Sequence, residues 1–454
     1  MSIQSVNPAT GDIIETLEPT SPQDLERALA GAHSAFLEWR TRPFAQRATL
    51  MHGAAKELRA RKSEYAATMT REMGKPIVQA EAEVEKCAAT CDYYAEHAEA
   101  FLAEQPRETD ASRSYVRFDP LGVVLAVMPW NFPFWQVFRF AAPALMAGNG
   151  GILKHASNVP RCALQIEAVF QRAGFPPGLF RTVLADPAAV KRIIADPRVA
   201  AVTLTGSEVA GIAVAQQAGH ELKKTVLELG GSDPFIVLAD ADVDAAAAAA
   251  TEGRLINSGQ SCIAAKRFIV VEPVADRFLE RFTAELASRK MGDPTARDTQ
   301  VGPQARMDLR DQLHQQVAES VKRGARALLG GQVPAGKGAF YPPTLLSAVD
   351  RGMPAFDEET FGPVAAVIRA KDEAAAIALA NDSPFGLGAA LWTRDRARAE
   401  RLAAQIEAGA VFVNGVVKSD PRLPFGGIKR SGYGRELSEY GIREFVNIKS
   451  VWIA

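Results

Sequence analysis

Residues 121–133 read Leu-Gly-Val-Val-Leu-Ala-Val-Met-Pro-Trp-Asn-Phe-Pro. The apolar run at 121–128 is short and ends at a proline, which favours a buried strand over a helix. The two prolines that follow restrict the backbone of the next loop. Similar runs, separated by helical segments and by Gly or Pro turns, occur at 152–154, 180–184, 199–205, 225–229 and 235–238. This alternation predicts βαβ units around a parallel sheet, and therefore an α/β fold.

The pattern extends in both directions from this stretch. Residues 22–104 are rich in Ala, Glu and Lys and predict helices. Further β-rich runs at 267–271, 364–368, 387–392 and 410–414 predict a second α/β domain. A second domain agrees with the length of 454 residues, because one hydrophobic core stops growing at roughly 250–300 residues. Alternating runs at 115–118 and 445–453 predict a projecting ribbon whose free edges pair with another subunit.

Composition excludes several classes of function. Lys plus Arg is 52 against 53 for Asp plus Glu, a net charge of −1, which gives no electrostatic footprint for nucleic acid or an anionic membrane. The N-terminus lacks the pattern of a signal peptide, and no apolar run approaches the ~20 residues of a membrane helix. Four scattered cysteines make no disulfide scaffold, and six histidines show no metal-binding spacing. We expect a cytoplasmic protein with no metal, nucleic-acid or membrane partner.

Two common fingerprints are missing. The sequence contains neither G-x-G-x-x-G, typical of dinucleotide sites, nor the G-x-S-x-G of hydrolases. Gly206 and Gly211 have the spacing of a P-loop, but Ile212 stands where that motif needs a lysine.

Cys262 follows the polar, flexible stretch Asn257-Ser-Gly-Gln-Ser. A lone cysteine is usually a small buried hydrophobe, and that interpretation stays open. The polar and Gly neighbours favour a reactive thiol instead. With an ordinary pKa only about 3% would be thiolate at pH 7, so a nucleophile at this position needs activation nearby.

Glu228 ends the apolar run at 225–229 and is followed by two glycines. It is therefore predicted at the carboxyl edge of the parallel sheet, where α/β proteins bind ligands. Burial there would raise its pKa toward the range of a general base. A strand-end glutamate paired with a lysine is the alternative.

Two further loops combine polar side chains with strand ends. The Asn131 amide, between two prolines, could stabilise a developing oxyanion by about 3 kcal/mol, or the loop could be a rigid structural turn. Ser207 is a natural N-cap and Glu208 suits a first helical turn. Such a helix N-terminus is also fit for a pyrophosphate, although capping alone explains these residues equally well.

Together these loops resemble the aldehyde dehydrogenase superfamily over nearly the whole chain. The matching motifs, in the family's order, are Pro-Trp-Asn-Phe-Pro at 129–133, Lys154 after Gly-Gly-Ile-Leu, Thr-Gly-Ser at 205–207, Glu-Leu-Gly-Gly at 228–231, Gly-Gln-Ser-Cys at 259–262, Glu-Thr-Phe-Gly-Pro at 359–363 and Pro-Phe-Gly-Gly-Ile-Lys-Arg-Ser-Gly-Tyr-Gly-Arg-Glu at 424–436. Within the superfamily, the stretches at 130–143, 154–160 and 418–424 resemble short bacterial succinate-semialdehyde dehydrogenases.

The resemblance implies a covalent mechanism. Cys262 attacks the aldehyde, Asn131 and the Cys262 backbone N–H hold the oxyanion, hydride leaves to a nicotinamide, and Glu228 activates the water that hydrolyses the thioester. Because aldehydes have no leaving group, a thiohemiacetal must first supply the carbon from which hydride departs. Many NAD-preferring relatives carry Glu where this chain has Ser157, so NADP should be accepted and could be preferred to NAD. The residues implied at the cofactor are Trp130, Lys154, Ser157, Gly206, Ser207, Leu229, Glu359 and Phe361.

The substrate implied is an aldehyde with a distal carboxylate. Arg139 matches an arginine that binds this carboxylate in larger relatives, and Ser419 or Arg422 would complete the site; a surface salt bridge is the alternative for Arg139. Two positions depart from the pattern. Ala264 replaces a second cysteine, so we expect no redox switch, and Ile256 replaces another carboxylate-binding arginine, so the contact must be built differently.

The resemblance also implies a domain plan. A Rossmann-type cofactor domain comprises 1–108 and 126–230, an α/β catalytic domain 231–430, and oligomerisation strands 109–125 and 431–454, giving a homodimer or homotetramer. Three rival functions remain: a CoA-acylating aldehyde dehydrogenase, a broad-specificity aliphatic aldehyde dehydrogenase, and a non-catalytic family member. Glu228 argues against the first, since CoA-dependent relatives often lack that base. Intact Cys262, Glu228 and Asn131 argue against the third.

Overall fold

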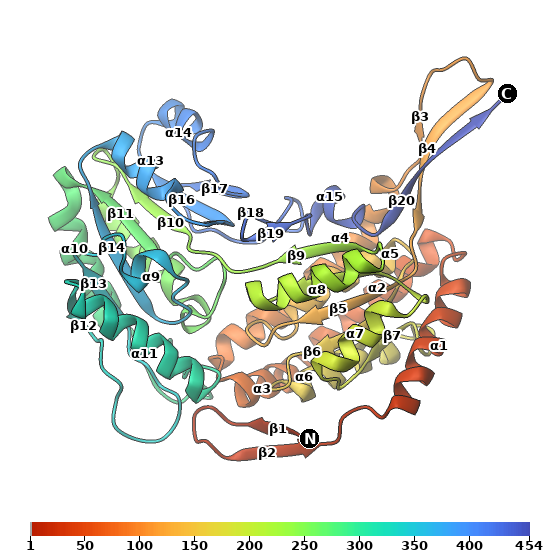
Figure 1. Ribbon diagram of the computed structural model, residues 1–454, viewed down its shortest axis with the longest axis horizontal. Helices are drawn as coiled ribbons and strands as arrows, with labels where there is room; N and C mark the ends of the chain where they lie inside the picture. Colours follow the sequence, from red (N-terminus) through yellow and green to blue (C-terminus); the bar gives the residue numbers. More distant parts are fainter. Residues whose placement is uncertain (1) are drawn as a thin grey trace.

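The computed structural model describes residues 2–454 and contains two large sheets that lie side by side (Figure 1). The first is six-stranded, with the order β19-β9-β8-β5-β6-β7. Its strands are β5 (Val123–Met128), β6 (Gly150–His155), β7 (Phe180–Thr182), β8 (Val199–Thr205), β9 (Lys224–Glu228) and β19 (Gly432–Tyr433).

The strand order of this sheet positions the functional loops. The five strands β5 to β9 are all parallel to their neighbours in the sheet. Across the sheet their order is β7-β6-β5-β8-β9, so the strand that comes first in the chain lies in the middle. This is the doubly wound arrangement, whose switch point lies between β5 and β8. The loops after these two strands begin at Pro129 and Gly206, so a crevice is expected where they part.

The second sheet is seven-stranded, with the order β12-β13-β14-β11-β10-β16-β17. It is parallel except for β12, which pairs antiparallel with β13 at one edge. The strands are β10 (Pro234–Val237), β11 (Arg267–Val271), β12 (Arg326–Leu329), β13 (Thr344–Ser347), β14 (Val364–Ala370), β16 (Gly388–Trp392) and β17 (Ala410–Val413). The predicted runs match these strands closely, but the sequence analysis did not predict β12 and β13.

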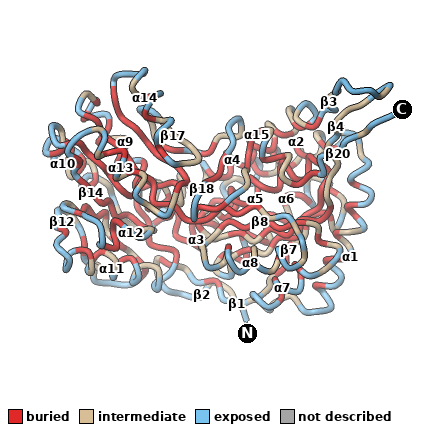
Figure 2. Tube along the Cα trace, turned by 45° about the horizontal axis from the view of Figure 1, so that its top comes forward, coloured by how far each residue is buried: buried red, intermediate tan, exposed pale blue. Residues whose placement is uncertain are grey.

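Helices cover both sheets. The predicted N-terminal helices are present, and α4, the longest, packs against α2, α3 and α5. Apolar side chains from these helices, from β5 and from β10 and β11 belong to one buried cluster, so the core is continuous between the sheets (Figure 2). The helices are α1 (Pro22–Trp39), α2 (Phe44–Ala60), α3 (Lys62–Met73), α4 (Ile77–Phe101), α5 (Trp135–Met146), α6 (Pro160–Arg172), α7 (Pro187–Ala195), α8 (Glu208–His220), α9 (Val243–Leu255), η1 (Ile256–Gly259), α10 (Glu272–Ala287), α11 (Met307–Lys322), α12 (Pro354–Asp357), α13 (Glu373–Asn381), α14 (Arg396–Ala403) and α15 (Ser438–Ile442).

A ribbon projects from the body of the molecule next to the C-terminus (Figure 1). Strand β20 (Val446–Ile453) pairs antiparallel with β4 (Arg113–Pro120), which also carries the short β3 (Gln105–Pro106). β20 is an edge strand, and it exposes Ile448 by 63% and Trp452 by 55%. The smaller remaining strands are β1 (Ile3–Val6), β2 (Ile13–Leu17), β15 (Phe385–Gly386) and β18 (Ile428–Lys429).

Part of the C-terminal segment lies outside the projecting ribbon. Residues 431–445 were expected to be oligomerisation strands, but they lie on the body of the molecule. β19 pairs with β9 of the first sheet, and α15 packs against α4 and α5. The apolar side chains of Leu437 and Ile442 are buried there, which holds this segment in the core rather than in the ribbon.

Candidate active site

A cavity of about 210 Å³ lies where the switch-point loops meet the second sheet. It is lined from the loops after β5, β8 and β9, from the loop that carries Cys262, and from the loop after α12. We call it the thiol cavity. The structure thus brings together, from distant parts of the sequence, the predicted residues Trp130, Asn131, Gly206, Ser207, Leu229, Cys262, Glu359 and Phe361.

The backbone before Cys262 is sharply turned. Asn257, Ser258 and Gly259 all have φ between 52° and 78°, the left-handed region that side chains other than glycine rarely adopt. At Gly259 any Cβ would collide with the carbonyl of Gly362. Such a turn persists only where its surroundings hold it. Here the Asn257 amide donates to the Asn131 carbonyl oxygen at 2.6 Å and to that of Gln260 at 3.0 Å.

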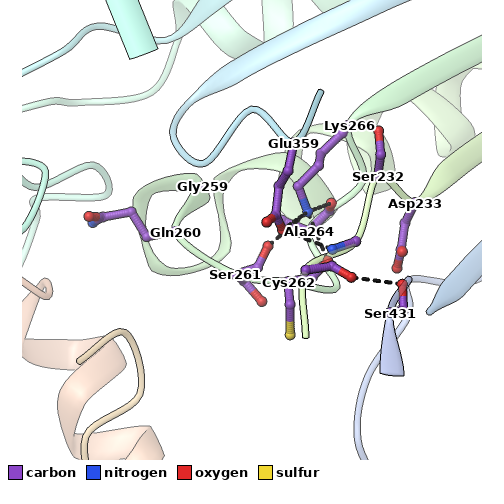
Figure 3. A network of polar contacts seen from close by, with 12 residues as sticks. Ser232, Asp233, Gly259, Gln260, Ser261, Cys262, Ala264, Lys266, Glu359 and Ser431 are labelled. Carbon is purple, nitrogen blue, oxygen red and sulfur yellow. Dashed lines mark hydrogen bonds and ion pairs between the residues drawn. The ribbon is translucent and has the colours of Figure 1, made fainter. Parts of the chain in front are cut away.

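Lys266 fixes the other side of the nucleophile loop (Figure 3). Its Nζ is fully buried and donates to the carbonyl oxygens of Ser261, Cys262 and Ala264 at 3.1, 2.8 and 3.2 Å. It also lies 3.4 Å from Glu359 Oε1. The Cys262 sulfur points away from this network (Figure 3), so Lys266 orients the loop backbone and leaves the thiol free.

The two glycines after Glu228 allow this loop to approach. A Cβ at Gly231 would lie 2.8 Å from the Cys262 carbonyl oxygen, so a side chain there would displace the nucleophile loop. The Gly231 N–H donates to Glu359 Oε1 at 3.0 Å. The motif Glu-Leu-Gly-Gly therefore joins the first sheet to both Cys262 and Glu359.

The Cys262 thiol is not activated in this state. Burial raises its pKa to about 12, against the opposing positive charges of Arg139 and Lys266. The expected local activation is therefore absent, and the thiol is protonated at neutral pH. The other three cysteines, Cys87, Cys91 and Cys162, are buried and unpaired, and none lines the thiol cavity.

Asn131 points its amide toward the nucleophile loop. Its Nδ2 donates to the Gln260 carbonyl oxygen at 3.1 Å, while its buried Oδ1 has no hydrogen-bond partner. An amide nitrogen carries two N–H groups, so one is still available for an oxygen bound beside Cys262. Asn131 and Cys262 line the same cavity, and the predicted role of Asn131 as an oxyanion donor stays a prediction.

Glu228 lies in a buried cluster of charges beside the cavity. Burial, together with the neighbouring Glu436 carboxylate, raises the pKa of Glu228 well above its ordinary value. Both carboxyl oxygens lack hydrogen-bond partners, and the carboxyl packs against Gly426 rather than lining the thiol cavity. The raised pKa was predicted from the sequence, but its main charged neighbours are acids and arginines rather than a lysine.

Arg139 belongs to the same cluster. It is fully buried, forms an ion pair with Glu436, and lies over the Phe425 ring at 4.4 Å. The alternative of a surface salt bridge is wrong, because the pair is enclosed. The chain already supplies a carboxylate to this guanidinium. A role for Arg139 in binding the substrate carboxylate therefore stays a prediction, and the structure does not place Arg139 in a cavity wall.

Two other predicted cofactor residues, Lys154 and Ser157, lie at the expected sheet edge but outside the cavity wall, whereas Ser207 lies in it. Ser207 is the N-cap of α8, as predicted, and accepts from the Ala210 N–H at 3.4 Å. Lys154 is half-buried near the end of β6, and burial lowers its pKa. Ser157 is exposed in the turn that follows β6.

A second, larger cavity of about 580 Å³ lies beyond Phe132 and Trp135. We call it the distal cavity. Ile256 lines it, together with Lys86 from α4. Ser419 is buried and accepts a hydrogen bond from Lys86 Nζ at 2.7 Å. The predicted role of Arg422 stays a prediction: its side chain is 74% exposed and ion-paired with Asp420 at 2.6 Å.

The sequence analysis missed two cations of the site. Lys266 could have been suspected, because it and Arg267 are the two charged residues in the otherwise apolar run from Ile263 to Val271, where an unpaired charge is costly. Lys86 gave no such signal, since lysine is ordinary on a helix rich in Ala and Glu. Within residues 2–454 no cluster of acidic, His and Cys side chains could hold a metal ion, and no helix has the length and apolarity to cross a membrane.

A thiol and an amide donor beside the switch point of a doubly wound sheet define a dinucleotide-dependent oxidoreductase that works through a cysteine. A sequence model described as the aldehyde dehydrogenase family matches residues 1–451, and the chain belongs to that family.

Individual relatives agree over their full lengths. The chain is 54% identical to a probable succinate-semialdehyde dehydrogenase [NADP(+)] of Synechocystis sp. and 53% identical to a succinate-semialdehyde dehydrogenase [NADP(+)] of Mycobacterium leprae, with 100% of each chain covered. Its structure matches that of succinic semialdehyde dehydrogenase from Streptococcus pyogenes in complex with NADP+, with a TM-score of 0.97, 40% identity and 99% of each chain covered. The predicted fold class is confirmed.

Proposed function

We propose that this chain oxidises succinate semialdehyde to succinate with NADP+ as the preferred hydride acceptor and NAD+ as a poorer one. The observation that carries this proposal is the thiol cavity, in which Cys262 and Asn131 stand beside the loops of the switch point. The names of the full-length relatives support the substrate and the cofactor.

The residues around the switch point fit a dinucleotide phosphate. The N-terminus of α8, capped by Ser207, lies at the cavity wall and suits a pyrophosphate. At the end of β6 the chain offers Lys154 and Ser157, and the neutral Ser157 side chain does not repel a 2′-phosphate. Glu359 and Phe361 would hold the nicotinamide riboside, and Leu229 would contact its amide.

The first half of the reaction takes place at Cys262. The thiol proton passes to a water molecule of the cavity, Sγ bonds to the aldehyde carbon, and the carbonyl electron pair moves to oxygen. Asn131 Nδ2 and the Cys262 backbone N–H donate to this oxyanion. Leu229, Glu359 and Phe361 would hold a nicotinamide, which would supply the acceptor for the hydride from this carbon, so that a thioester to Cys262 would remain.

The second half requires Glu228. A water molecule attacks the thioester carbon, its proton passes to the Glu228 carboxylate, and the bond to Cys262 Sγ breaks to give the free acid. Because the carboxyl group packs against Gly426 in this structure, its side chain must turn toward the thiol cavity for this step. The raised pKa makes Glu228 an effective base once it is ionised.

Steady-state kinetics on a panel of aldehydes tests the proposal. Succinate semialdehyde, glutarate semialdehyde and butanal are each offered with NADP+ or NAD+, with and without CoA. We expect the highest kcat/KM for succinate semialdehyde with NADP+ and the same yield of free succinate with or without CoA. Equal kcat/KM for butanal would instead identify a broad-specificity enzyme, and formation of succinyl-CoA an acylating one.

The exposed ribbon supports a homo-oligomer. β20 presents a free edge and exposed apolar side chains at Ile448 and Trp452, a surface that a second subunit would cover. Sedimentation should give a dimer or tetramer, and a species of 48.8 kDa would contradict this part of the proposal. The free cysteines support a reducing, cytoplasmic location.

A further inference from the structure

Lys86 directs a positive charge into the distal cavity. It lies on α4 and is half-buried. Its Nζ donates to Ser419 Oγ at 2.7 Å and lies 4.1 Å from the centre of the Trp135 ring. A hydroxyl and an aromatic face can hold an ammonium group in place without neutralising its charge.

The other cations of this cavity are neutralised by the chain. Arg289 pairs with Glu285 at 3.1 Å, and Arg297 pairs with Glu81 at 3.0 Å. For Lys86 the partner recorded within residues 2–454 is the Ser419 hydroxyl. Burial, with a further contribution from the charge of Arg139, lowers the pKa of Lys86 to about 8. An anionic ligand would stabilise this half-buried ammonium group, which has no carboxylate partner in the described structure.

The cavity that contains Lys86 adjoins the loop that carries Asn131. Phe132, which lines its cavity, directly follows Asn131, and Trp135, which also lines it, begins α5 at the end of the same loop. Ser419, its hydrogen-bond partner, lines a small cavity together with Ile263, the residue after Cys262. The positive charge of Arg139 acts to lower the pKa of both Lys86 and Cys262. A short substrate bound at the thiol can therefore extend toward Lys86.

We propose that Lys86, held by Ser419 and Trp135, binds the distal carboxylate of the substrate and so selects ω-carboxylated aldehydes over neutral ones. This inference rests on the proposed function. It also accounts for the apolar Ile256, which lines the same cavity. Position 256 carries no positive charge here, and Lys86 on α4 supplies one instead. A single ammonium supplies a charge-assisted hydrogen bond to one carboxylate oxygen.

Two variants of Lys86 test the proposal against a matched control. Lys86→Met removes both the charge and the hydrogen bond, whereas Lys86→Gln keeps a donor for Ser419 and removes the charge alone. Arg297→Gln is the control, because Arg297 also lines the cavity but is 68% exposed and paired with Glu81. The readout is the ratio of kcat/KM for succinate semialdehyde to kcat/KM for butanal.

We expect both Lys86 variants to lower this ratio by about 10- to 100-fold, chiefly through KM for succinate semialdehyde, as for loss of a hydrogen bond to a charged group. Arg297→Gln should keep the ratio within about twofold. If the wild type prefers succinate semialdehyde and both Lys86 variants keep that preference, the inference fails and the proposed function stands. If the wild type has no such preference, the proposed function itself fails.

The pH dependence of the wild type gives a second test that needs no variant. With a pKa of about 8, Lys86 loses its charge as pH rises, while the substrate carboxylate stays ionised. The charged groups around it are Arg139 on α5, Glu83 on α4 and Asp420 on the loop after β17. The same kcat/KM ratio should fall at least about fivefold between pH 7 and pH 9.5. Titration of Cys262 or Glu228 changes kcat/KM for both aldehydes alike and therefore cancels in the ratio. A ratio that stays constant with pH would overturn the inference.

Discussion

The two cavities on either side of the loop 129–135 are built in different ways. The thiol cavity is lined by loops at the ends of β5, β8 and β9, and its residues come from motifs that can be read along the sequence. The distal cavity is lined largely from α4, from α9 and from the loop between α10 and α11, and its polar residues are isolated in the sequence. Under the two proposals above, the chemistry takes place at a sheet edge, and substrate choice depends on a cavity lined partly by helices.

This difference predicts two kinds of variant. Residues of the thiol cavity and the charge cluster beside it should affect all aldehydes alike. Residues of the distal cavity should affect the choice among aldehydes, as proposed for Lys86. If a thiol-cavity variant changed the preference among aldehydes, or a distal-cavity variant affected all aldehydes alike, the two cavities would act as one site.

Replacing Glu228 should have the largest effect. Glu228→Gln removes the proposed base, so kcat should fall by about 10²- to 10⁴-fold for charged and neutral aldehydes equally. Stopped-flow kinetics should show one equivalent of NADPH released in a burst, followed by slow turnover. Because burial raises the pKa of Glu228, wild-type deacylation should accelerate as pH rises and the carboxyl ionises, and the variant should lack this rise. A loss of kcat with no burst would mean that Glu228 acts before hydride transfer.

Replacing Asn131 should have the next largest effect. Asn131→Ala removes a donor to the oxyanion, which is worth about 3 kcal/mol, so kcat should fall by roughly 10²- to 10³-fold. The loss should again be equal for succinate semialdehyde and butanal. Fluorescence titration should give an unchanged Kd for NADP+, which separates loss of the donor from collapse of the cavity. A loss confined to KM would contradict the role in the transition state.

Ser157 should affect the choice of cofactor alone. Ser157→Glu places a carboxylate at the end of β6, and its repulsion of a 2′-phosphate should lower kcat/KM for NADP+ relative to NAD+ by about 10- to 100-fold. Ser157→Gln has a similar size without the charge and should lower this ratio less. Equal ratios in the two variants would show that shape, not charge, decides the cofactor.

Arg422 should have the smallest effect. Its ion pair with Asp420 is exposed, and such pairs contribute about 0–1 kcal/mol to stability. Arg422→Ala should therefore keep kcat/KM within about twofold for every aldehyde, with a small change in the free energy of unfolding. A selective loss for succinate semialdehyde would place Arg422 at the substrate site.

The same contrast explains what the sequence could predict. Cys262, Asn131 and Glu228 lie next to glycines, prolines or strand ends, so their unusual local context indicated a site before any contact was known. The β runs of both sheets were predicted for a similar reason, because their apolar pattern is local. The strands β12 and β13 lie outside this pattern, with β12 exposed along most of its length.

Contacts between distant residues could not be predicted. Lys86 and Ser419 are 333 positions apart, and their hydrogen bond depends on how α4 packs beside the loop after β17. Glu436 joins Arg139 only because the segment 431–445 folds back onto the first sheet. The raised pKa of Cys262 likewise reflects its burial by all of these elements together.

Intact-protein mass spectrometry of the quenched reaction examines the covalent step itself. Glu228→Gln is mixed with succinate semialdehyde and NADP+, stopped in acid within the first turnover, and digested for peptide mapping. The account predicts the mass of one succinyl group on the peptide that contains Cys262, absent when NADP+ is omitted. Succinate formed by the wild type with no modification ever detectable at Cys262 in either protein, under conditions that preserve thioesters, would contradict it.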